Sequence, residues 1–296
     1  MIQQHEFKRG RQRLSFRRWA LPGERETLVL CHGLASNGTR WSEFAEATVP
    51  QRPWNILCPD LCGHGGSVVR GRINLDIWAD DLAALLDHEG VTQAVVGGHC
   101  LGANLALHFV RRHPDRTRGL VLVEPMFAQA LGGILGKLRR IRYLLPALAW
   151  PILLFNALGL YRRELPGLDL RRLDEHSRRA VEEAGDPAAI TGRYAKPGKD
   201  MFYMPSAAYL QALNQVLRPL RGLETIDCPA LALLSTGGLF GDPQRTRELL
   251  SRLPKVQIDE LEALHWIPTE QPRALQSHVG DWLDTLAAGE SDDSQR

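Results

Sequence analysis

The segment from Val95 to Leu107 constrains the fold more than any other part of the sequence. It begins as a short apolar run, breaks at the sequence GGHCLG (residues 97–102) and continues at once with helical spacing. Gly98 and Gly102 have no side chains, so a strand and a helix can pass close together on either side of a tight turn. We therefore expect the thiol of Cys100 to project alone from a strained turn at a helix N-terminus, where a thiol is readily converted to the reactive thiolate.

Composition narrows the class of protein. The chain has 296 residues, of which 44% are hydrophobic and 24% are charged, which suits one large core with an insertion. A net charge of +2 gives no support for a nucleic-acid partner. The N-terminus lacks an apolar stretch of signal-peptide length, and five cysteines, an odd number, suit reduced thiols. We expect a cytoplasmic protein without a metal site, because the cysteines form no paired C-x-x-C pattern.

Strand-like and helix-like segments alternate along most of the chain. This alternation indicates a mostly parallel sheet covered by helices on both faces. The alternation stops near Met126 and resumes near Cys228, and the segment between them has helical spacing and is rich in leucine. We expect a core formed by residues 1–125 and 223–286, a helical cap inserted at 126–222, and a loose polar tail at 287–296. The expected strands are His5–Arg9, Gln12–Trp19, Thr27–Cys31, Asn55–Pro59, Gln93–Gly97, Gly119–Glu124, Pro229–Ser235 and Val256–Leu261.

Three further motifs accompany the glycine-flanked cysteine. In chain order they are LVLCHGL (residues 28–34), PDLCGHGGS (59–67) and ALHWIP (263–268). With GGHCLG between the second and the third, the series resembles the α/β-hydrolase superfamily over most of the chain outside the cap and tail. The resemblance implies a mostly parallel central sheet flanked by helices, with the cap over the carboxyl edge of the sheet.

The resemblance also implies roles for single residues. Cys100 matches the nucleophile and His265 the general base, while the backbone N–H groups of Leu34 and Leu101 match the oxyanion hole. Attack on a carbonyl places negative charge on its oxygen, and each prealigned donor is typically worth ~3 kcal/mol of barrier. An imidazole suits the base, because it gains and loses a proton near neutral pH.

The acid partner of the histidine has two candidates. The family usually places an aspartate shortly after the strand that residues 231–235 resemble, and here a glycine-rich stretch delays the first carboxylate to Asp242. Glu124, at the end of the preceding strand, is the alternative, since some members of the superfamily carry the acid there. We prefer Asp242.

The cap contains an unusually apolar stretch. Residues 143–161 include no charge, although their length of nineteen would allow a membrane span. A single crossing would put Cys100 and His265 on opposite sides of a bilayer, so short kinked helices are expected instead. Their apolar side chains either pack the cap against the core or cover an acyl-binding groove whose basic rim rests on an anionic membrane surface. The basic residues of that rim are Lys137, Arg139, Arg140, Arg142, Arg162 and Arg163.

The sequence thus predicts a hydrolase of an acyl ester, lactone or thioester. It would act through a Cys-His-Asp triad and an S-acyl intermediate on Cys100, would prefer an apolar acyl group and would need no cofactor. One alternative is an acyltransferase or cyclising enzyme that uses the same intermediate. Another is a ligand-binding member that has lost turnover.

Overall fold

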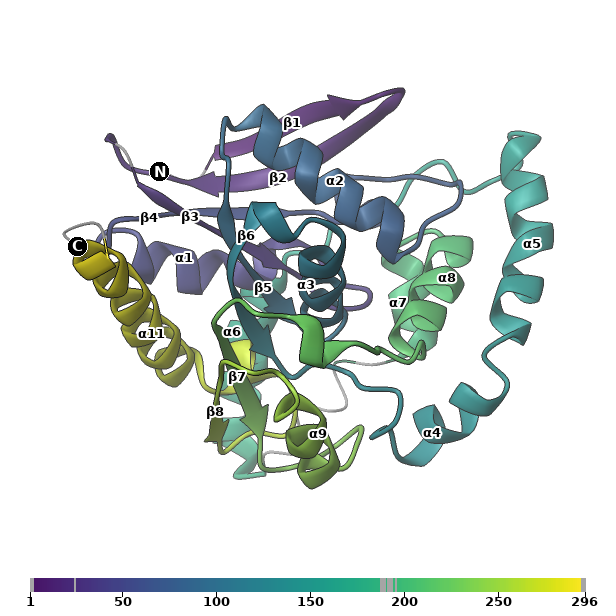
Figure 1. Cartoon of the computed structure of the whole chain (residues 1–296). Helices are drawn as coiled ribbons and strands as arrows, with labels where there is room; N and C mark the ends of the chain where they lie inside the picture. Colours follow the sequence, from purple (N-terminus) through teal and green to yellow (C-terminus); the bar gives the residue numbers. More distant parts are fainter. Residues whose placement is uncertain (1–2, 24, 187–189, 191–193, 195, 294–296) are drawn as a thin grey trace.

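The computed structural model describes residues 3–23, 25–186, 190, 194 and 196–293. Its centre is an eight-stranded sheet in the order β1-β2-β4-β3-β5-β6-β7-β8 (Figure 1). Each strand coincides, within two residues at either end, with a strand expected from the sequence. The strands are β1 (Gln3–Arg9), β2 (Gln12–Trp19), β3 (Glu26–Cys31), β4 (Trp54–Pro59), β5 (Ala94–His99), β6 (Thr117–Val123), β7 (Ala230–Ser235) and β8 (Val256–Leu261).

The sheet is mostly parallel. Only β1 with β2 and β2 with β4 pair antiparallel; the strands from β4 through β3, β5, β6 and β7 to β8 pair in parallel. Every residue of β5 and of β7 is buried, as expected for central strands with both faces covered. The carboxyl ends of the parallel strands therefore meet at one edge, which is where an α/β sheet places its functional loops. The expected fold class is confirmed.

Helices cover both faces of the sheet. Buried side chains of α2, α3, α8 and α9 form the core on one face, and those of α1 and α11 form it on the other (Figure 1). Helix α2 begins after Asn74, because the side chain of Asn74 accepts the N–H of Ile77 at 2.8 Å. The bounds are α1 (Ser42–Thr48), α2 (Leu75–His88), α3 (Leu101–Arg112), α8 (Ser206–Val216), α9 (Pro243–Leu250), α10 (Ile267–Glu270) and α11 (Pro272–Asp293).

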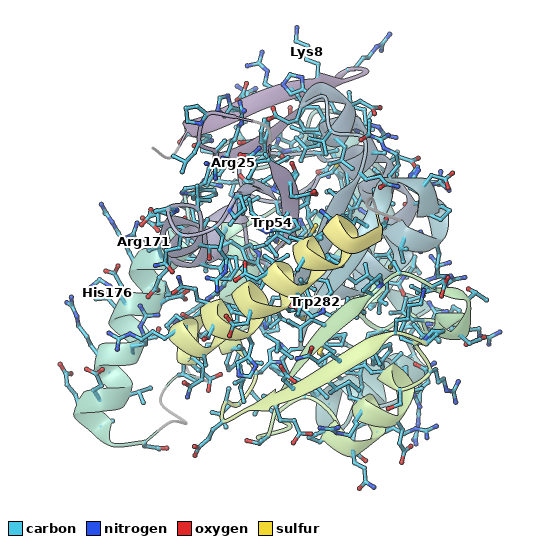
Figure 2. The ribbon with its side chains drawn as sticks, turned by 60° about the vertical axis from the view of Figure 1, so that its left-hand side comes forward. Lys8, Arg25, Trp54, Arg171, His176 and Trp282 are labelled. Atoms are coloured by element: carbon cyan, nitrogen blue, oxygen red, sulfur yellow. The ribbon has the colours of Figure 1, made fainter. Side chains whose placement is uncertain are left out.

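Helix α11 lies across the second face. Figure 2 shows Trp282 on this helix and Trp54 of β4 behind it, and both belong to the buried cluster there. In the same view His176 of the cap helix α6 (Leu170–Ala184) lies at the outside of the molecule, while Arg171 of this helix pairs with Glu46 of α1 at 2.7 Å. The loose tail expected at 287–296 is corrected in part, since α11 runs on to Asp293, and residues 294–296 lie outside the described part of the chain.

The inserted region between β6 and β7 is helical, as expected. Its other helices are α4 (Gly133–Arg140), α5 (Leu144–Ala157) and α7 (Pro197–Tyr203), and α5 stands at the outer edge of the molecule (Figure 1). Helix α8 lies between α5 and α3, and its buried side chains join the main core. Within the described residues, no helix combines the length and the apolar character that crossing a membrane requires.

Candidate active site

The turn between β5 and α3 carries Cys100. Its backbone has φ 56° and ψ −114°, a conformation that residues other than glycine rarely adopt. A Cβ built on either Gly98 or Gly102 would run into the carbonyl oxygen of Cys31, so both glycines are needed for the close crossing of strand and helix. The N–H of Cys100 donates to the carbonyl of Val123 at 2.9 Å, which fixes the turn to β6. The thiol, 9% exposed, faces a cavity under the cap.

His265 lies in the loop between β8 and α10, and its side chain meets that of Cys100. The imidazole is buried; its Nδ1 lies 2.9 Å from Oε2 of Glu124, and it forms a hydrogen bond with the Cys100 side chain. Burial lowers the pKa of His265, but the hydrogen bonds and charges of Cys100 and Glu124 outweigh burial and raise the pKa to about 9. The geometry therefore favours the protonated imidazole, flanked by sulfur on one side and a carboxylate on the other.

Glu124, and not Asp242, is the carboxylate at the imidazole. It follows β6 at φ 51°, and its second oxygen, Oε1, accepts the N–H of Ser235 at 2.5 Å. Asp242 instead caps α9, where its side chain accepts the N–H of Arg245 at 3.1 Å. Our preference for Asp242 is thus corrected by the geometry. An aspartate directly before a proline is a helix-start signal, and that feature of the sequence could have shown its structural role.

Leu34 and Leu101 both lie near Cys100. Leu101 is the first residue of α3, and the first amides of a helix have no partner within it. Leu34 lines the same cavity as Cys100. A Cβ on its neighbour Gly33 would lie 3.3 Å from the Cβ of Cys100, which shows how closely this loop approaches the turn.

Glu270 holds the loop that carries His265, and the sequence analysis assigned it no role. Its carboxylate accepts three backbone N–H groups, from Leu264 at 2.8 Å, His265 at 3.1 Å and Trp266 at 2.7 Å. The signal lay in the sequence as an acidic residue five positions after the histidine. Three bonds to one carboxylate fix the backbone from which the imidazole extends.

Two further histidines form hydrogen bonds to the backbone of the loops around the site. His99 donates from Nε2 to the backbone carbonyl of His265 at 3.0 Å, and burial keeps its pKa well below the ordinary value, so the ring is neutral. His32 donates from Nδ1 to the carbonyl of Gly33 at 2.8 Å and accepts the N–H of Leu61 at Nε2. Among the residues that the structure describes, no group of three His, Cys, Asp or Glu side chains is arranged to hold a metal ion.

The cavity above Cys100, here called the catalytic cavity, has a volume of about 410 Å³. Cys100 and His265 lie at its floor. Its walls and roof are mostly apolar. They include Ile134, Leu135 and Leu138 of α4, Leu170 and Leu173 of α6, Tyr209, Leu213 and Val216 of α8, and Phe240 and Trp266.

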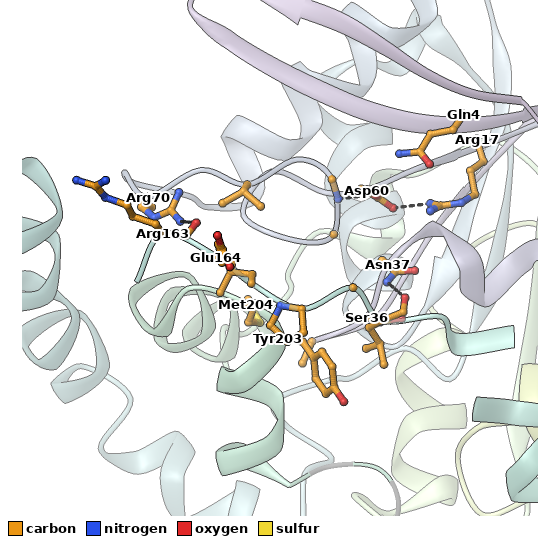
Figure 3. Close-up of a pocket in the computed structure, with 18 residues that line it drawn as sticks. Gln4, Arg17, Ser36, Asn37, Asp60, Arg70, Arg163, Glu164, Tyr203 and Met204 are labelled. Carbon is orange, nitrogen blue, oxygen red and sulfur yellow. Dashed lines mark hydrogen bonds and ion pairs between the residues drawn. The ribbon is translucent and has the colours of Figure 1, made fainter. Parts of the chain in front are cut away.

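A second, more polar cavity adjoins the first. Its volume is about 630 Å³, and the two share Ala35, Ser36, Leu168 and Tyr203 as lining residues. Figure 3 shows the ion pair between Arg17 and Asp60, 2.9 Å apart, at one end, and the charged side chains of Arg70, Arg163 and Glu164 at the other. The loop that carries Leu34 thus lies where an apolar and a polar compartment meet.

A buried ion pair ties the cap to the core beside the catalytic cavity. Nη1 of Arg40 lies 2.5 Å from Oδ1 of Asp174 on α6, and the hydroxyl of Tyr194 donates to the same oxygen at 2.6 Å. Burial acts to lower the pKa of Arg40, but the charge of Asp174 and the hydrogen bonds outweigh it and raise the pKa. Nothing in the sequence pattern pairs these two residues, which lie 134 positions apart.

Comparison with known proteins agrees with this geometry. Residues 26–270 match the family model for the alpha/beta hydrolase fold. The chain is 36% identical to lipase LipV of Mycobacterium tuberculosis over 115 residues, or 39% of this chain and 42% of that relative, so the match spans less than half of LipV. It is 25% identical to a putative carbamate hydrolase RutD of Caulobacter sp. strain K31 over 277 residues, 90% of this chain and 93% of that one. A thermophilic esterase from Thermogutta terrifontis shares the fold, with a TM-score of 0.69, 21% identity and coverage of 96% and 99% of the two chains. This chain belongs to the alpha/beta hydrolase family of enzymes.

Proposed function

We propose that the protein hydrolyses an acyl ester, lactone or thioester through an S-acyl intermediate on Cys100, with His265 and Glu124 completing the triad. The observation that carries this proposal is the hydrogen-bonded series Cys100–His265–Glu124 at the floor of an apolar cavity. A lipase and an esterase among the similar proteins support the same reaction class.

The chemistry follows from the charge state of the histidine. With its pKa near 9, His265 is protonated at neutral pH, the form that pairs with a thiolate. The thiolate attacks the carbonyl carbon and forms a carbon–sulfur bond, while the amides of Leu34 and Leu101 stabilise the oxyanion. The bond to the leaving group breaks, and the imidazolium gives its proton to the departing oxygen or sulfur. Neutral His265 then takes a proton from water, hydroxide attacks the thioester, and the acid leaves as the thiolate returns.

The two cavities fit the two ends of an amphiphilic substrate. Each methylene buried in the catalytic cavity is worth ~0.8 kcal/mol, so an eight-carbon acyl chain gains up to about 6 kcal/mol before ordering costs. The polar cavity lies beyond the Leu34 loop, where it would receive the leaving group. We therefore expect a medium-length acyl chain on a polar leaving group.

Intact mass spectrometry tests this function directly. The protein is mixed with 4-nitrophenyl esters, lactones and N-acetylcysteamine thioesters of graded acyl length, quenched in acid and weighed. We expect an acyl adduct that maps to Cys100, forms fastest with a medium chain and is absent from Cys100→Ala. Unchanged turnover of these substrates by Cys100→Ala would overturn the proposal, and the absence of any adduct or turnover would favour a member that only binds its ligand.

The polar cavity has its own test. An N-acetylcysteamine thioester carries the same acyl thioester group as a coenzyme A thioester but lacks the rest of the pantetheine arm and the charged nucleotide. We expect Arg163→Ala to raise KM for the coenzyme A thioester and to leave that for the N-acetylcysteamine thioester unchanged. An equal change in KM for both substrates would show that the polar cavity does not bind the leaving group.

Acyl transfer is the second candidate, because the adjoining cavity offers room for an acceptor beside the thioester. Adding alcohols, amines or thiols to a reaction with an acyl thioester distinguishes the two. A transferase yields the transferred product faster than free acid, and a hydrolase yields free acid at a rate that the acceptor does not change.

A further inference from the structure

The outer surface of the cap reverses the usual distribution of apolar side chains. Fourteen large hydrophobic side chains are exposed in the described part of the chain, and twelve of them lie in the cap between Ile134 and Phe202. Most of these belong to helix α5 and the residues next to it, which we call the α5 surface. It includes Tyr143, Leu144, Leu148, Trp150, Leu154, Phe155, Leu158, Leu160 and Tyr161.

Helix α5 is apolar on both sides. Leu145 and Ala149 are buried on the side that packs against α8. On the sides turned away from α8, Leu144, Leu148 and Phe155 are exposed, and Figure 1 shows the helix standing at the margin of the molecule. A helix that is apolar all round is normally buried, so the outward side lacks the environment that its side chains favour.

The charged side chains of this stretch of the cap are basic, and the first acidic residue after it is Glu164. Residues 134–163 contain six Lys and Arg and no Asp or Glu. Lys137 and Arg140 are exposed on α4, immediately before α5, and Arg162 and Arg163 follow it. Within the described residues, no carboxylate lies at ion-pair distance from any of these six. Apolar side chains between positive charges are complementary to an anionic phospholipid surface, whose headgroups attract the cations while the interface accepts the apolar side chains.

We propose that the α5 surface docks on an anionic phospholipid bilayer. The helix has 14 residues and is about 21 Å long, too short to cross a hydrocarbon core of about 30 Å, so it lies in the plane of the interface. Ile134 of α4 lines the catalytic cavity and is also 73% exposed, which places a rim of that cavity beside the docked surface. Delivery of an acyl chain from the membrane to Cys100 rests on the proposed function, whereas docking itself does not.

The protein carries a natural reporter of this contact. Of its seven tryptophans, Trp150 on α5 is 62% exposed, and each of the other six is at most 8% exposed. Vesicles of phosphatidylcholine alone, or mixed with phosphatidylglycerol, are titrated into the protein while its emission is recorded. We expect a blue shift with the anionic vesicles that weakens with salt, is small with the neutral ones and is absent from Trp150→Phe.

Variants test which side chains of the α5 surface and its basic flanks contribute to lipid binding. Leu148→Glu combined with Phe155→Glu is expected to lower the partition coefficient, measured by co-sedimentation with vesicles, at least tenfold, and Lys137→Glu with Arg140→Glu is expected to lower it on anionic vesicles only. Leu21→Glu changes an exposed leucine outside the cap and should bind as the parent protein does. None of the four cap positions lines the catalytic cavity, so turnover of a dissolved short-chain ester should stay unchanged.

Two results would overturn docking. One is an emission spectrum that no vesicle changes; the other is a dimer in sedimentation whose Trp150 is already shielded without lipid, which would assign the surface to a second copy of the chain. Cys100→Ala keeps this outcome separate from the proposed function, because it should bind vesicles as the parent does even when turnover is lost.

Discussion

The floor and the roof of the catalytic cavity are built on different principles. At the floor, Glu124 and Glu270 use both carboxylate oxygens on named partners, and the Cys100 turn is fixed by glycines and by a bond to β6. Behind the roof, α5 packs one side against α8, which lines the cavity, and turns an apolar side outward. The floor fixes the reacting groups through many backbone bonds, whereas the roof is held by apolar packing and by a few side-chain bonds such as Arg40–Asp174. Changes at the floor should therefore alter the reaction, and changes at the roof should alter what reaches it.

The largest effect is expected at the acid of the triad. Glu124→Gln keeps the size of the side chain but removes the charge opposite Nδ1 of His265, and we expect turnover to fall at least about 100-fold. Asp242→Asn is the matched control; since asparagine caps a helix as well as aspartate does, turnover should stay within about twofold. Steady-state rates on one acyl ester check both. A loss confined to Asp242→Asn would return the acid role to the residue preferred from the sequence.

The next largest effect is expected at the buried ion pair that joins the cap to the core. Asp174→Ala leaves Arg40 buried without its carboxylate, and we expect the free energy of unfolding to fall by about 3–5 kcal/mol. Arg171→Ala breaks a more exposed pair with Glu46 and should cost about 1 kcal/mol or less. Urea unfolding measures both. Equal costs would mean that the buried pair does not fasten the cap.

A third effect depends on pH. The pKa of His265 is about 9 in the folded protein against an ordinary 6.5, so the folded state binds this proton more tightly than the unfolded state does. The resulting stabilisation is fully present below pH 6.5 and is lost as the pH rises through about 9. Urea unfolding of the parent and of His265→Gln should show a stability difference that shrinks over this range. A difference that grows with pH contradicts the protonated imidazole.

The smallest effect is expected at the loop of the histidine. Glu270→Gln weakens the acceptor of three backbone bonds without touching substrate, and we expect kcat to fall roughly tenfold with KM unchanged. The alkaline limb of the pH–rate profile should move as well, since the setting of the imidazole changes. Glu262→Gln, an exposed neighbour, is the control. A change in stability alone, with kcat and the pH profile intact, would leave Glu270 a purely structural role.

Local patterns predicted the strands and the turn at Cys100 because the constraints on these features are local. Apolar runs marked the buried strands, and the glycines beside Cys100 marked the turn, since a side chain at either position would meet Cys31. The choice between Glu124 and Asp242 depended on where two loops meet in space, which spacing along the chain does not encode. The pairing of Arg40 with Asp174 likewise depends on how segments far apart in the chain meet in space.

The roof was less predictable. The sequence showed an apolar stretch with basic flanks, but whether its side chains face the core or the solvent depends on how α5 is rotated against α8. Helix α8 itself, assigned to the cap from its position in the chain, supplies buried side chains to the main core. At the other end of the chain, polar composition suggested a loose tail where α11 continues to Asp293.

The sulfur at the turn also exposes the enzyme to oxidants. A serine there would be indifferent to peroxide, whereas a thiol beside a protonated imidazole can pass to sulfenic acid and on to irreversible forms. Burial raises the pKa of Cys31, Cys58, Cys62 and Cys228 and so keeps those thiols unreactive. Oxidative damage would therefore concentrate on Cys100, and the proposed activity would be lost while the fold remained intact.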